Sequence, residues 1–176
     1  MQTDVLVALL VVISTDITTH TAGWNVKQFV GTLQKIWTVK TTNRAFMQCE
    51  VDQLRSAAAL SILFERSYII GRRRRDVLLE GVFDRRQKKR MTLFNRDTFT
   101  STETMVFMDP DRSCAVMKVE SLRDFGAFYY DLRVTNSSIT SRPRPSCPHY
   151  FNRLVGFRPS FTVYSPNCQD LFIGEQ

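Results

Sequence analysis

Hydrophobic residues recur along the chain in short runs of strand length, and turn signals separate these runs about every ten residues. The apolar and β-branched runs predict strands at residues 35–41, 77–83, 89–94, 104–108, 114–120, 128–135 and 161–164. Turn-forming sequences such as Asp109-Pro110-Asp111 and Phe125-Gly126 lie between them. Many short strands at this spacing indicate an antiparallel barrel or sandwich.

Helical patterns flank this strand region. Apolar residues at 24–33 are spaced for one face of a short helix, which we expect before the first strand. Residues 148–155 fit one or two helical turns, with Phe151, Leu154 and Val155 facing inward and Pro148 in the first turn. The Arg- and Pro-rich residues 142–145 predict an extended connector ahead of that helix.

Residues 50–70 support two interpretations. The Ala-rich stretch 54–63 has the propensity of a helix, whereas residues 64–70 favour an extended strand. Both interpretations stay open at the level of the sequence.

The N-terminus is typical of a secretory signal peptide. The apolar run 5–13 is too short to cross a bilayer as a helix and is followed by small and polar residues at 14–23. Thr21-Ala22-Gly23 offers a cleavage site, so we expect a signal peptide at 1–23 and one domain at 24–176, although the leader lacks Lys and Arg. The alternative is a buried N-terminal strand. Cleavage removes two aspartates and neither Lys nor Arg, so the formal charge rises from +7 to +9.

Cysteine usage and a sequon agree with secretion to the extracellular space. Cys49, Cys114, Cys147 and Cys168 all follow the leader, and an even count in a secreted chain indicates two disulfides, for which three pairings exist. No C-x-x-C spacing occurs and few histidines are present, which argues against a metal site. Asn136-Ser137-Ser138 is an N-glycosylation sequon, so we expect a glycan on Asn136.

The composition is that of a folded globular protein, with 43% hydrophobic and 23% charged residues. No P-loop, G-x-G-x-x-G or H-E-x-x-H motif occurs. Only one histidine, His149, follows the leader, so the residues that a catalytic triad requires are almost absent. Carboxylates near turns, such as Glu103 and Asp109, are interpreted as solvated. We therefore expect a binding protein without enzymatic activity, cofactor or metal.

Two basic runs suggest a polyanion-binding surface. Nine positive charges fall within nineteen residues, at Arg72, Arg73, Arg74, Arg75, Arg85, Arg86, Lys88, Lys89 and Arg90. The alternative is a pair of solvated loops between strands. Because no aromatic residues are interleaved with these charges, we expect glycosaminoglycan rather than nucleic acid as the partner.

An ordered set of short sequences spans residues 24–170. It comprises Lys35-Ile36-Trp37-Thr38-Val39-Lys40-Thr41, Cys114-Ala115-Val116-Met117-Lys118-Val119, Tyr130-Asp131-Leu132-Arg133-Val134, Tyr150-Phe151-Asn152 after Cys147, and Val163-Tyr164-Ser165 before Cys168. With these sequences the chain resembles the salivary lipocalins of ticks, the family of the histamine-binding proteins. The resemblance implies an all-β fold, an eight-stranded antiparallel barrel with a short N-terminal helix and a C-terminal helix packed outside. It also implies the pairs Cys49–Cys168 and Cys114–Cys147.

The family's amine binders carry a Tyr–acidic–Leu–Trp strand whose acid and Trp face a ligand cavity. Here Asp131 keeps the acid and Arg133 replaces the Trp, while Ala115 and Met105 stand where some amine binders carry acids. Alternation alone places Asp131 and Arg133 on the more polar strand face, in solvent, whereas the resemblance directs them into the cavity with Tyr129. If both side chains lie in the cavity, Asp131 and Arg133 pair with each other, or Arg133 instead holds a ligand carboxylate.

The resemblance implies a cavity lined by Asp131, Tyr129, Arg133, Trp37, Phe107, Phe99 and Met105. We expect a secreted, monomeric protein, not inserted in a membrane, that sequesters a host mediator. A biogenic amine such as histamine or serotonin comes first because Asp131 is kept. An anionic lipid mediator is second because of Arg133, and a heparin-like polyanion on the basic runs is third.

Overall fold

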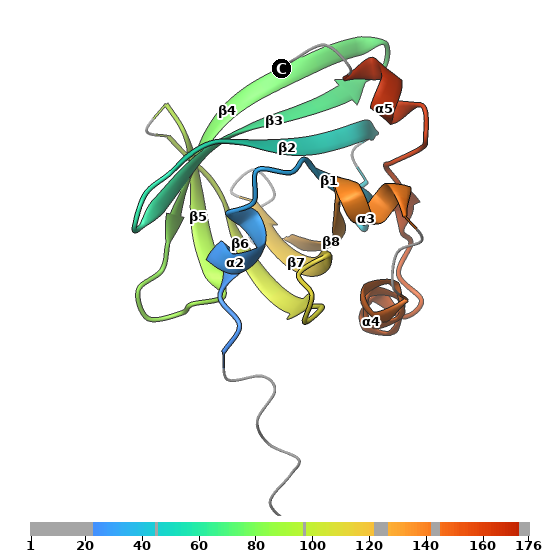
Figure 1. Ribbon diagram of the computed structural model, residues 1–176. Coiled ribbons are helices and arrows are strands. Elements are labelled where there is room, and N and C mark those ends of the chain that lie inside the picture. Colours follow the sequence, from blue (N-terminus) through green and yellow to red (C-terminus); the bar gives the residue numbers. More distant parts are fainter. Residues whose placement is uncertain (1–22, 45, 97, 122–126, 142–144, 173–176) are drawn as a thin grey trace, which may run out of the picture.

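The computed structural model describes residues 23–44, 46–96, 98–121, 127–141 and 145–172, which form a barrel with short helices outside it (Figure 1). The strands of the barrel are β1 (Ile36–Thr41), β2 (Met47–Ala57), β3 (Ser61–Ile70), β4 (Arg73–Phe83), β5 (Arg90–Asn95), β6 (Thr98–Met108), β7 (Cys114–Ser121) and β8 (Phe128–Thr135). The remaining elements are α2 (Val26–Val30), α3 (Asn136–Thr140), α4 (Ser146–Val155), β9 (Phe161–Thr162) and α5 (Cys168–Leu171). Within these residues, no helix is long and apolar enough to cross a membrane.

The sheet closes on itself through β1. Each strand from β2 to β8 pairs antiparallel with the next, and β1 pairs with both β8 and β2. The β1–β2 pairing covers only Ile36 with Asp52 and Trp37 with Val51, after which the two strands separate. The C-terminal segment fills that gap, because β9 pairs with β1 and the amide of Cys49 donates to the carbonyl of Val163 over 2.8 Å. This closure confirms the expected eight-stranded barrel and adds β9 to it.

The two ends of the barrel differ. At one end, here called the closed end, α2 covers the barrel: the side chain of Asn25 caps the helix, the amide of Val26 donates to the carbonyl of Lys88, and Phe29 is buried in the core. Strands β1, β3, β5 and β7 run towards the other end, here called the open end, and β2, β4, β6 and β8 begin there. The expected N-terminal helix is therefore confirmed and shuts one end of the barrel.

Helix α4 lies outside the barrel against β6, β7 and β8 (Figure 1). It buries Cys147, Phe151 and Val155 against the outer face of β8, where Leu132 and Val134 are also buried. The predicted helix at 148–155 begins at Ser146, and Leu154 is half-buried rather than central. As a consequence both faces of β8 are buried, one against α4 and one inside the barrel.

The Ala-rich stretch 54–63 is a hairpin and not a helix. Strand β2 runs to Ala57 and β3 begins at Ser61, with Leu54 opposite Phe64. Pairing across two long strands outweighs the helix propensity of three consecutive alanines, which is worth well under about 1 kcal/mol per residue. Helices α3 and α5 were not expected, and strand β4 begins four residues before the predicted strand. The predicted signal peptide, the Phe125-Gly126 turn and most of the 142–145 connector lie outside the described residues.

Both disulfides implied by the resemblance are present. Cys49–Cys168 ties the C-terminal segment to β2 across 119 residues of sequence, and Cys114–Cys147 ties α4 to β7 across 33 residues. The first bond holds β9 in the gap between β1 and β2, and the second holds α4 over β8.

Loop-closure entropy predicts unequal contributions from the two bonds. Replacing Cys49 and Cys168 together with alanine should lower the free energy of unfolding by about 1 kcal/mol more than the same change at Cys114 and Cys147, because the longer loop gains more freedom in the unfolded chain. Chemical denaturation of both double variants measures the difference. Equal losses, or a larger loss at Cys114–Cys147, would contradict the entropic account.

Candidate ligand-binding site

Charged side chains fill the middle of the barrel. Asp131 and Arg133 of β8 are 2% and 1% exposed, and Tyr129 of the same strand packs on the interior cluster. The placement implied by the resemblance is therefore the correct one, and the solvated reading of Asp131 is wrong. The reason lies in α4, which buries the apolar face of β8 from outside and leaves the polar face to point inward.

Two arginines link carboxylates from opposite sides of the barrel. Arg133 makes two hydrogen bonds to Glu103 of β6, of 2.6 and 2.8 Å, and one of 3.0 Å to Asp131. Arg66 of β3 donates to both oxygens of Asp52 over 2.7 and 2.8 Å and to Glu103 over 3.1 Å. Glu103 thus accepts from both guanidiniums. We call these five side chains the interior charge network, and they join β2, β3, β6 and β8.

The network carries more negative than positive charge. Glu50 of β2 is also buried, where it accepts a 2.7 Å hydrogen bond from Thr38, so four carboxyl groups face two guanidiniums. Burial would raise the pKa of Glu103, but Arg133 and Arg66 lower it to about 2. Burial raises the pKa of both Glu50 and Asp131, because the arginine charge near them does not compensate for the loss of water.

Glu50 and Asp131, the two carboxyls whose charge is not fully compensated, lie together on the side of the network that faces the open end. They line one small cavity with Thr38, Thr41, Met47, Tyr129 and Val163. Oδ1 of Asp131 has no hydrogen-bond partner among the described residues, although it is buried. Burial and the neighbouring Asp131 raise the pKa of Tyr129, so its phenol stays a neutral hydrogen-bond donor. We call Glu50, Tyr129 and Asp131 the mouth site.

Other residues expected in the cavity have different positions. Met105 is fully buried in the interior apolar cluster, towards the closed end, and Phe99 is half-buried against Phe94, with ring centroids 6.1 Å apart. Trp37 faces out of the barrel, where it packs on Tyr164 and Phe172 and donates to Asn136 over 2.8 Å.

Phe107 also lies outside the barrel. Its ring stacks on Tyr150 of α4, with centroids 4.4 Å apart. Because of a register shift between Met105 and Phe107, these two side chains of β6 point to opposite faces of the strand. The expectation that Trp37 and Phe107 line the cavity is therefore corrected, because each is covered by a C-terminal element that alternation along one strand does not reveal.

The expected cavity residues did not include Glu50 or three members of the network, Asp52, Arg66 and Glu103. The expectation that Glu103 and Asp109 are solvated is wrong, because both are buried. A signal was present in β3, where Ile62, Phe64 and Arg66 share one strand face by alternation, which places a charge in line with two core residues.

The predicted polyanion-binding residues do not form one surface. Arg73, Arg74 and Arg75 belong to β4 itself, at the open end, whereas the turn from Arg85 to Lys89 lies at the closed end. Strand geometry separates the two runs by about 30 Å. The interpretation of both as loops is also corrected, since only the second run is a loop.

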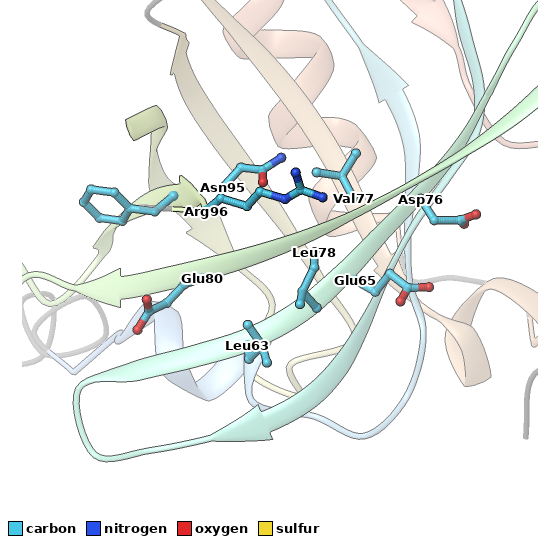
Figure 2. Close-up of a pocket in the computed structure, with 9 residues that line it drawn as sticks. Leu63, Glu65, Asp76, Val77, Leu78, Glu80, Asn95 and Arg96 are labelled. Carbon is cyan, nitrogen blue, oxygen red and sulfur yellow. The ribbon is translucent and has the colours of Figure 1, made fainter. Parts of the chain in front are cut away.

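A large groove lies beside β4, outside the interior network (Figure 2). Strands β4 and β5 pair only from Glu80 to Phe83 of β4, and beyond that point they diverge. The resulting space measures about 700 Å³ and is lined by Leu63, Glu65, Asp76, Val77, Leu78, Glu80, Phe94, Asn95 and Arg96. Glu65 is paired with Arg55, and Asp76 with Arg74, so part of its acidic lining is already neutralised.

The barrel matches solved structures of one architecture. The serotonin complex of a protein designated AM182 has a TM-score of 0.65 and 17% identity, over 86% of this chain and 97% of that one. The siderocalin Ex-FABP has a TM-score of 0.57 and 13% identity, over 76% and 93%. Lobster apocrustacyanin A1 has a TM-score of 0.56 and 10% identity, over 83% and 88%. The chain has the lipocalin fold. No protein-family model matches this sequence, and no curated protein matches it either.

Removing the central carboxylate tests the network. Glu103→Gln should lower the free energy of unfolding at neutral pH by about 3–5 kcal/mol, because it removes the negative charge that compensates the guanidiniums of Arg66 and Arg133. The pKa of Glu103 is about 2 when folded and 4.5 ordinarily, so its stabilisation is complete above about pH 4.5 and is lost as the pH falls towards 2.

Denaturation of Glu103→Gln between pH 2 and 7 should therefore show a smaller loss of stability in acid than the unmodified chain shows. The matched control is Glu80→Gln on the exposed face of β4, with an expected change within about 0.5 kcal/mol. A neutral effect of Glu103→Gln at pH 7 would contradict the assigned role.

Proposed function

We propose that this lipocalin is a secreted, non-enzymatic protein that sequesters a small cationic amine, such as histamine or serotonin, at the mouth site. The observation that carries the proposal is the excess of carboxylates inside the barrel. Glu50 and Asp131 lie together with incomplete compensation, and one oxygen of Asp131 is without a partner among the described residues. An ammonium group between them supplies the missing positive charge and hydrogen bonds.

The same geometry disfavours an anionic lipid mediator. Arg133 is the side chain expected to hold a lipid carboxylate, but both of its terminal nitrogens already bind Glu103 and Asp131. Arg66 is likewise engaged by Asp52 and Glu103. A ligand carboxylate entering here meets the buried carboxyls of Glu50 and Asp131, so Coulomb repulsion opposes it.

Tyr129 acts as the gate of the mouth site in this proposal. The space among its lining residues is about 10 Å³, which suits a single water molecule. Tyr129 is half-buried near the start of β8, at the open end. An incoming amine displaces its ring, which then offers its face to the ammonium group and its hydroxyl as a hydrogen-bond donor. The disulfide Cys49–Cys168 and the similarity to the AM182 serotonin complex support an extracellular amine binder.

Calorimetric titration with histamine, serotonin and a leukotriene tests the proposed function. We expect an amine to bind and the leukotriene not to bind. Asp131→Asn and Glu50→Gln should each weaken amine binding at least tenfold, because each removes one buried charge from the ammonium group. The matched control is Glu65→Gln on the outer face of β3, which should leave affinity unchanged. Binding of the leukotriene alone would overturn the proposal.

Acid should weaken amine binding. Protons compete with the ammonium group for Glu50 and Asp131, and burial raises the pKa of both carboxyls. A primary alkylammonium keeps its charge below neutral pH as a Lys side chain does, so the affinity for serotonin, which has no imidazole to titrate, should fall as the pH decreases below neutral. Titrations across this range should show a flatter profile for Asp131→Asn. An affinity that rises in acid would contradict the role of these carboxylates.

A further inference from the structure

The open end of the barrel gathers the exposed aromatic side chains. Among the described residues, every exposed phenylalanine lies there: Phe46, Phe128, Phe157 and Phe161, with Ile70 beside them. Phe46 is 89% exposed and Phe157 is fully exposed. They come from separate segments, namely the β1–β2 connection, the start of β8, the turn after α4, and β9. Exposed apolar side chains that are concentrated on one part of a protein surface mark an interaction site.

Arginines alternate with these rings around the same end. They are Arg44, Arg72, Arg73, Arg75, Arg96 and Arg158, and all are exposed. Arg44 shares a surface cavity of about 340 Å³ with Phe46 and Phe161, Ile70 pairs with Arg73, and the guanidinium of Arg158 lies 5.4 Å from the ring centroid of Phe128. We call these arginines, the four phenylalanines and Ile70 the basic aromatic rim.

Acidic groups on the neighbouring strands do not offset the rim. Asp76 of β4 is paired with Arg74 at 2.8 Å, and Glu120 of β7 is paired with Lys118 at 2.8 Å. Within the described part of the chain, the rim therefore presents positive charge and apolar rings together.

We propose that the basic aromatic rim docks the barrel on an anionic lipid bilayer, with the open end facing the membrane. Guanidinium groups bind lipid phosphates and are attracted by the negative surface potential of the bilayer. Phenylalanine rings insert among the acyl chains next to the headgroups. A sulfated polysaccharide uses the arginines but gains nothing from Phe46 and Phe157, so the bilayer is the partner that explains both features. The inference does not depend on amine binding.

Co-flotation with vesicles tests the docking. The protein should bind phosphatidylcholine vesicles that contain about one third phosphatidylserine and should not bind phosphatidylcholine alone. Arg72→Gln with Arg73→Gln should reduce binding about 25-fold, from about fivefold for each basic residue at an anionic surface. Phe46→Ser with Phe157→Ser should reduce it at least tenfold, and because both rings are exposed these changes leave the fold intact.

The closed end provides matched controls. Arg85→Gln with Arg86→Gln removes the same charge from the opposite end, and Leu33→Ser removes a side chain that is 82% exposed. Both should leave vesicle binding within twofold of the unmodified protein. Calorimetric titration with amine should be unchanged in every rim variant, which separates this inference from the proposed function.

Orientation has its own readout. Tryptophan emission from Phe46→Trp should be quenched by brominated acyl chains, whereas emission from Leu33→Trp should not be. Equal quenching at both ends, equal losses in the rim and closed-end variants, or no flotation with anionic vesicles would overturn the proposal. Retention on heparin that the phenylalanine changes leave intact, without flotation, would overturn it in favour of a polyanion surface.

Discussion

Pairing of buried charge inside the barrel is the constraint on which the rest of this structure depends. Six acidic and basic side chains enter the interior, and a charge removed from water must be compensated by an opposite charge and hydrogen bonds. Arg66 and Arg133 reach across the barrel to Glu103, so strands that are not neighbours in the sheet are joined through their side chains. The interior is thereby held at a fixed width by ionic contacts rather than by apolar packing alone.

The network also divides the interior into layers. Towards the closed end, Phe29, Met91 and Met105 form an apolar layer under the short helix. Towards the open end, Glu50 and Asp131 remain with too little positive charge, and Tyr129 lies beside them. Because the guanidiniums are committed to Glu103 and Asp52, the chemistry left for a ligand is that of carboxylates. The proposed selectivity for cations would follow from this order and not from the presence of any one residue.

The elements that pack outside the barrel determine which face of a strand points into the interior. Helix α4 and the C-terminal segment, each held by a disulfide, cover β8 and β1 from outside. In β8 the apolar residues Leu132 and Val134 pack under α4, and the charged residues Asp131 and Arg133 turn inward. The same C-terminal segment closes the gap between β1 and β2. The two ends of the barrel then differ in character, one capped by a helix and the other ringed by arginine and phenylalanine.

The sequence by itself determined the class of fold, because strand-length apolar runs with regular turns and four cysteines leave few alternatives. It also indicated the strands and the two main helices, and with the resemblance it indicated both disulfides. Only the tertiary structure decided that Asp131 and Arg133 are inside, that Trp37 and Phe107 are outside, and that the two basic runs are far apart. The physical reason is that alternation reports which residues share a face, whereas the direction of that face depends on what packs against it from distant parts of the chain.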